Sequence, residues 1–300
     1  MYRRPGADRR LAITKIAALA MIVPTAIAVM SIPAAAQPAS RARPFVHTAA
    51  ASPFTYASGT RRYRITSVDT RTQNQAGGRA PFEFTTTTTQ FVTLTLTPRT
   101  RDTLALALTL DSVAVSSTLD APPANTDGLR GARMEGTISP QGKTYAFAPA
   151  TGETDRIKIA LYRAFSRFLA AVPPQLAAGT TWTDTTTESF RRGEFDIKTS
   201  TVTTSKVAGD TTVAGQHAWR VERNGVLSTS GDGMEKGIPI HLSADGTIRS
   251  VQLLSQTGVF LGSAGTQSTH VAMSMTESAG GESQPIQEVI KSTVEALPGQ

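Results

Sequence analysis

The sequence predicts a mainly β protein made of two antiparallel curved-sheet units, half-barrel-like in form, joined by one amphipathic helix. Three observations predict this fold. Apolar and polar residues alternate over most of the chain after Tyr63, and a period of two is typical of strands with one buried face. Threonine is abundant, and β-branched residues favour pleated, half-exposed surfaces. One segment, 157–172, instead has its apolar residues at helical spacing.

The N-terminus, residues 1–36, carries the features of a cleaved signal peptide. Four Arg residues precede the apolar stretch 16–29, and three Ala residues end at Ala36, where we expect cleavage. That stretch is shorter than the ~20 residues of a spanning helix, and no longer apolar run follows, so we expect no integral membrane span after signal removal. We therefore expect a periplasmic or secreted protein, with 37–59 as a flexible lead-in rich in Ala, Pro and Ser.

Charge and cysteine content exclude several classes of protein. Of the 30 basic and 23 acidic residues, the signal peptide holds five and one. The remainder therefore has a net charge of about +3, which is too small to indicate a nucleic-acid binder. The chain has no Cys, which excludes disulfides, thiol catalysis and Cys-ligated zinc.

The first β unit is expected over 60–149. Four Leu residues at alternate positions, Leu104 to Leu110, predict a strand with one buried face. The apolar phase changes at Val113, so we expect a β-bulge near Asp111. The turn 98–101 is expected to join this strand to the preceding one as a hairpin.

The second β unit is expected over 175–276. Strands are predicted at 182–190, 195–207, 217–221, 238–242, 248–254 and 271–275. Asn224-Gly225 is the strongest signal for a tight hairpin turn. A further Gly turn is expected at Gly246.

Helices are predicted at two places. The connecting helix, within 150–174, has Glu153 and Asp155 at its start, where the helix dipole favours acids, and Pro173-Pro174 at its end. In the tail 277–300, Ile286, Val289, Ile290 and Val294 suggest a second, shorter helix.

The two β units share short sequence signals in the same order, which suggests an internal duplication. Gly59-Thr60 corresponds to Gly179-Thr180, and Glu83-Phe84 corresponds to Glu194-Phe195. The turn 138–143 corresponds to 242–247. Shared hairpin chemistry in a Thr-rich chain explains the same matches without duplication.

No motif for catalysis, metal binding or cofactor binding is found. His47, His217, His241 and His270 lack the spacing of metal ligands. Nucleophile elbows, Walker loops and dinucleotide fingerprints are missing as well. We expect no cofactor, no metal and no enzymatic activity. Aromatic residues make up only 6% of the chain, which argues against an aromatic girdle of the kind found in outer-membrane barrels.

The segment Val172-Pro173-Pro174-Gln175-Leu176, leading to Gly179-Thr180-Thr181-Trp182, resembles a passage in secreted bacterial β-rich proteins of unknown function. The resemblance implies a β-rich fold with a middle helix and no site residues. More distantly, a curved sheet with a helix is similar to periplasmic lipoprotein-carrier folds.

The sequence favours a non-catalytic exported protein that binds a lipid or other hydrophobic small molecule or serves envelope maintenance. The helix stripe and the facing strands would form an apolar groove, or else simply the core. The alternatives are a structural or surface-interaction module and, third, a hydrolase with an unrecognised site. The groove residues we expect are Leu106, Leu108, Leu161, Phe165, Phe168, Ile240 and Leu242.

Overall fold

The computed structural model describes residues 51–74, 80–119, 126, 128–150, 168–192, 194–235, 238–275 and 285–298. The expected signal peptide, cleavage site and most of the lead-in lie outside these residues. The described part is built from strands and contains no helix long and apolar enough to cross a membrane. The strands are β1 (Ser52–Pro53), β2 (Gly59–Gln73), β3 (Phe82–Thr100), β4 (Thr103–Ser117), β5 (Arg133–Ile138), β6 (Thr144–Pro149), β7 (Gln175–Leu176), β8 (Thr181–Arg192), β9 (Phe195–Val213), β10 (Gln216–Glu235), β11 (Ile238–Ser255), β12 (Phe260–Met275) and β13 (Ile286–Ala296).

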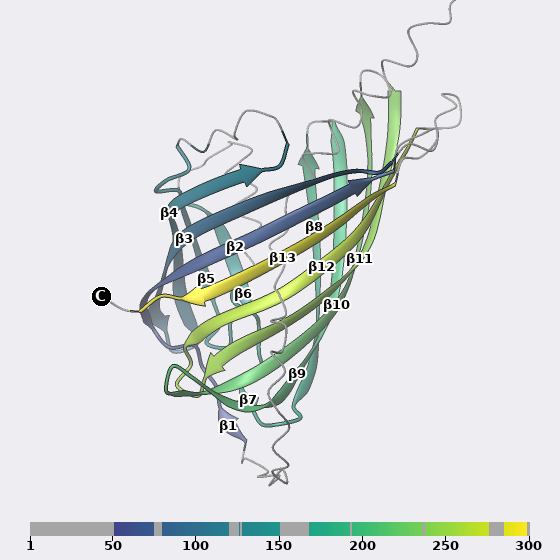
Figure 1. Ribbon diagram of the computed structural model, residues 1–300. Coiled ribbons are helices and arrows are strands. Elements are labelled where there is room, and N and C mark those ends of the chain that lie inside the picture. Colours follow the sequence, from purple (N-terminus) through teal and green to yellow (C-terminus); the bar gives the residue numbers. More distant parts are fainter. Residues whose placement is uncertain are drawn as a thin grey trace, which may run out of the picture.

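The mainly β, antiparallel prediction is confirmed, but the prediction of two units joined by a helix is wrong. Eleven strands form one sheet in the order β6-β5-β4-β3-β2-β13-β12-β11-β10-β9-β8. The two expected units are continuous because β13 pairs with β2 along the whole length of β13, from Ile286 opposite Gln73 to Ala296 opposite Tyr63. The sheet curls strongly, so that β2 and β8 lie on opposite walls of a concave space (Figure 1).

Two local predictions in the first β region are confirmed. Leu110 pairs with Val92 and Ser112 pairs with Phe91, so Asp111 is the extra residue of a β-bulge. The hairpin between β3 and β4 turns at Arg101-Asp102, at the end of the predicted turn. The bulge lets both apolar phases of β4 face the same side of the sheet.

The predicted turns at Asn224-Gly225 and Gly246 are wrong, because both lie inside long continuous strands. A Cβ on Gly225 would lie 3.1 Å from the Thr203 hydroxyl, so this Gly permits close packing within the sheet. The tight turn between β9 and β10 is Ala214-Gly215, where both residues have positive φ, as hairpin turns of two residues require.

The third pair of matching segments behind the suggested duplication, 138–143 and 242–247, has different structures in the two regions. Residues 138–143 form the turn between β5 and β6, whereas 242–247 lie within β11.

The predicted helix at 286–294 is also wrong, because the segment is β13. Its buried residues alternate strictly, and they include Glu288 and Ser292 among the apolar ones. Since polar residues occupy two of the buried positions, only Ile286, Ile290 and Val294 remain as an apolar pattern, and their spacing of four imitates a helix.

The predicted connecting helix can be compared with the structure only at its C-terminal end. Residues 155–167 lie outside the described residues, and residues 168–172 are not helical. Their polar groups are bonded elsewhere: Val172 N–H donates to the Gln141 carbonyl at 2.9 Å, and the Ala170 carbonyl accepts from the Tyr56 hydroxyl at 2.9 Å. Pro173 also disfavours helical geometry at the residue before it.

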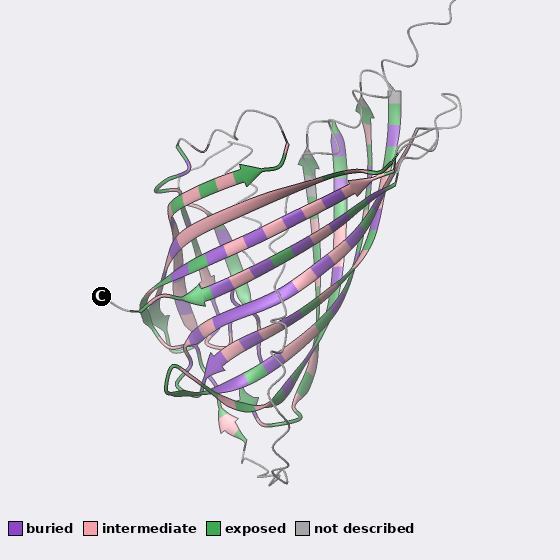
Figure 2. Cartoon of the chain, in the orientation of Figure 1, coloured by how far each residue is buried: buried purple, intermediate pink, exposed green. Residues whose placement is uncertain are grey.

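The main apolar core fills one end of the concave side. Two short segments cover the sheet there, one around β1 and one running from Phe168 to Leu176 through β7. Phe168 packs its ring against Tyr63 and Phe260, with centroids 5.2 and 5.4 Å apart. Burial alternates along the strands that line this side (Figure 2).

Candidate functional site on the concave face

The predicted groove residues do not come together as one group. Leu106, Leu108 and Phe168 are buried in the main core. Ile240 lies in a separate cluster with Phe195 and Ile197, and Leu242 packs against a third cluster. Leu161 and Phe165 lie outside the described residues.

The second and third clusters together form what we call the apolar rim, at the end of the sheet opposite the main core. It comprises Phe195, Ile197, Ile240, Leu242, Ala244, Val271, Met273 and Ile286.

A belt of buried polar side chains crosses the concave face between the main core and the apolar rim. Sequence reasoning missed it, because a polar residue at the inward phase of a strand resembles an exposed one. The polar belt comprises Ser67, Asp69, Arg71, Thr201, Thr203, Ser205, Ser250, Gln252, Ser263, Gln267, Thr269, Glu288 and Ser292.

Strand register aligns the belt across the sheet. Ser67 of β2 lies opposite Ser292 of β13 on one side and Thr88 of β3 on the other. The same row continues to Arg223 of β10 and Ser205 of β9. The belt joins the rim directly, since Ile286 and Val271 are two residues beyond Glu288 and Thr269.

An ion triad forms the charged part of the belt. Arg71 Nη2 lies 2.9 Å from Asp69 Oδ2 and 2.7 Å from Glu288 Oε1, and all three side chains are almost fully buried. Burial raises the pKa of Glu288 to about 7, although the Arg71 charge opposes that shift. Burial likewise raises the pKa of Asp69, against the same guanidinium. Near neutral pH Glu288 therefore retains part of a proton that a carboxyl group in water has already lost.

Several buried belt atoms have no hydrogen-bond partner among the described residues. Buried polar groups are normally paired, and each unpaired one costs about 1–3 kcal/mol. Six of these atoms are oxygens: Ser67 Oγ, Asp69 Oδ1, Thr201 Oγ1, Gln252 Oε1 and Ser292 Oγ of the belt, and Gln90 Oε1 beside it on β3. Arg223 Nε is likewise buried without a hydrogen bond, although Arg223 interacts through other atoms. All six oxygens lie on the concave face, and four of them are on the adjacent strands β3, β2 and β13.

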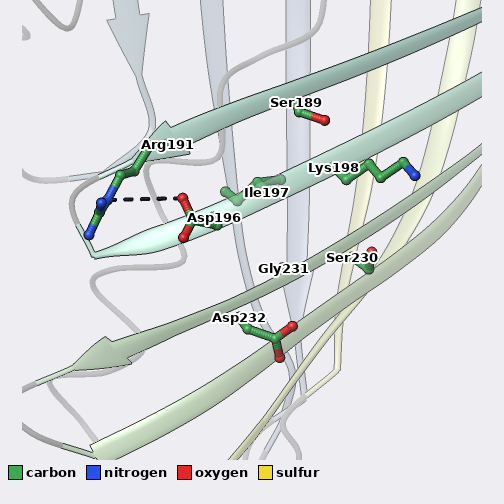
Figure 3. Close-up of a pocket in the computed structure, with 8 residues that line it drawn as sticks. All are labelled: Ser189, Arg191, Asp196, Ile197, Lys198, Ser230, Gly231 and Asp232. Carbon is green, nitrogen blue, oxygen red and sulfur yellow. Dashed lines mark ion pairs between the residues drawn. The ribbon is translucent and has the colours of Figure 1, made fainter.

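The convex face is different in character. It carries exposed Thr and Ser residues with charged side chains between them, including an exposed pair in which His241 Nδ1 lies 2.7 Å from Asp232 Oδ1. A shallow depression at the ends of β8, β9 and β10 includes the ion pair Arg191–Asp196 at 4.0 Å (Figure 3). Its lining residues are Ser189, Arg191, Asp196, Ile197, Lys198, Ser230, Gly231 and Asp232.

The described residues contain no group of three side chains able to hold a metal ion. His217, His241 and His270 are exposed. His47 lies outside the described part.

No protein-family model matches the chain, and no curated protein matches it. Among solved structures, OccK2 (OpdF) of Pseudomonas aeruginosa is 9% identical, with a TM-score of 0.26, over 80% of this chain and 98% of that chain. OccAB4 of Acinetobacter baumannii is 7% identical, with a TM-score of 0.25, over 80% and 99%. Likeness at this level carries no argument about function.

Proposed function

We propose that the protein is an exported, non-catalytic binding protein of the cell envelope whose concave face holds an amphipathic, lipid-like molecule. The supporting observation is the contact between a polar belt with unpaired buried atoms and an apolar rim separate from the main core. A ligand with a polar head and an apolar tail would complement both regions at once. The residues of the main core, including Leu106 and Leu108, have a structural role in this proposal.

The surface-interaction alternative is less well supported. It requires a flat, exposed Thr array on an edge strand, whereas the run Thr85–Thr89 lies in β3, between β2 and β4, and is half-buried.

Native mass spectrometry of the protein purified without detergent from its own envelope fraction tests the proposal. We expect an adduct with the mass of a lipid, and saturable binding of the uncharged probe Nile red after the adduct is removed. A bare protein mass together with no saturable binding of the probe would overturn it.

A further inference from the structure

We infer that the polar belt recognises an uncharged, polyhydroxylated head group, such as that of a sugar-bearing lipid, rather than an anionic one. This inference rests on the proposed function and specifies the ligand class of the same site. It follows from the hydrogen-bonding capacity of the unpaired atoms and from the charge of the concave face.

The six unpaired oxygens can all accept a hydrogen bond from a ligand donor. Asp69 Oδ1, Gln90 Oε1 and Gln252 Oε1 are oxygens of carboxylate or amide groups, and such oxygens only accept hydrogen bonds when the carboxyl is ionised. The phosphate or carboxylate oxygens of an anionic head also only accept, so they would leave these atoms unpaired.

The remaining unpaired atoms distinguish a polyol from an ammonium group. Ser67, Thr201 and Ser292 contribute hydroxyls, each of which both donates and accepts. An ammonium donates but cannot accept, whereas a sugar hydroxyl does both and can bond to every unpaired atom of the belt.

The densest group of these atoms lies on three adjacent strands. Ser67 and Ser292 are directly opposite each other, Asp69 is two residues along β2 in one direction, and Gln90 lies opposite Ile65, two residues along in the other. At about 3.3 Å per residue the group extends over roughly 13 Å along the strands, so a head group with several hydroxyls is needed to reach all of it.

The charge of the concave face also disfavours an anion. Between the main core and the apolar rim, the inward positions hold more carboxylates than guanidinium groups. The carboxylates are those of the buried Asp69 and Glu288 and of Asp184 and Glu188, which the register places on the same face as the belt residues of β9; the guanidinium groups are those of Arg71 and Arg223. Arg71 is already paired with two of these carboxylates.

Isothermal titration calorimetry of the full chain tests this with three probes that share an octyl tail, each below its micelle-forming concentration. We expect octyl glucoside to bind at least tenfold more tightly than octyl sulfate or octyltrimethylammonium. The double variant S67A/S292A should lose that preference while still binding the octyl tail. The control T66A/T293A changes a directly opposed pair on the same two strands but on the convex face, and should bind like the unchanged protein.

The outcomes separate the two proposals. Equal affinity for the three probes, or the tightest binding of octyl sulfate, would overturn the inference and leave the proposed function standing. Binding of glucose alone as tightly as octyl glucoside would support the belt as a sugar site and overturn the lipid-like ligand. Absence of binding by every probe would overturn both.

Discussion

Glu288 should make the folded protein less stable as the pH rises from about 4.5 to about 7. Its pKa is about 7 in the folded state and close to 4.5 in the unfolded state. Between these values the native chain binds a proton that the unfolded chain has lost, so the free energy of unfolding falls as the pH rises. A difference of about 2.5 pKa units corresponds to roughly 3 kcal/mol. Below pH 4.5 and above pH 7 this contribution is constant.

Urea unfolding of the unchanged protein and of E288Q, followed by Trp fluorescence from pH 4 to 8, isolates this effect. The difference in unfolding free energy between the two proteins should shift by about 3 kcal/mol in favour of E288Q as the pH rises. The control is E295Q, on the same strand, where Glu295 is exposed and pairs with Arg64. A difference that stays constant with pH would refute the buried, proton-holding triad.

Two further predictions concern the core and the segments that cover it. Trp219 is fully buried, whereas Trp182 is half-buried and donates one indole hydrogen bond at 3.0 Å. Chemical denaturation should therefore show that W219A lowers the free energy of unfolding by about 4 kcal/mol and W182A by about 2–3 kcal/mol. Equal losses would contradict the difference in burial. Gly258 has φ +83° and a Cβ there would lie 1.9 Å from the Thr55 carbonyl, so G258A should lower the thermal midpoint well beyond G179A, whose φ is +87° with open space around it.

Much of the strand content is predictable, because alternation is a local property. The bulge at Asp111 follows from a change of phase within a few residues, and the structure contains it. The partner of each strand is not local. Nothing near Ile286 in the sequence indicates that it lies opposite Gln73, more than two hundred residues earlier, so the single sheet was not predictable from alternation.

The candidate site shows a second physical limit. Prediction from hydropathy assumes that inward positions are apolar, which gave a strand with one buried face for Leu104 to Leu110 but a helix for β13. The belt violates that assumption at Ser67, Glu288 and Ser292, which are 7%, 4% and 0% exposed. A charged residue in phase with buried apolar neighbours, such as Glu288 between Ile286 and Ile290, is the signal that could have revealed it.

Removing the unpaired belt hydroxyls should stabilise the ligand-free protein, whereas most substitutions of buried residues destabilise it. At about 1–3 kcal/mol each, six such atoms cost an amount comparable with the 5–15 kcal/mol that stabilises a typical domain. Replacing Ser67 and Ser292 by Ala removes two of them and leaves only small cavities, so the ligand-free S67A/S292A protein should unfold at higher urea concentration than the unchanged one. With octyl glucoside at one hundred times its dissociation constant, the unchanged protein should gain about 2.7 kcal/mol and the variant less. A ligand-free variant that is less stable than the unchanged protein would show that these hydroxyls are already paired, and that the belt is a structural network rather than a binding surface.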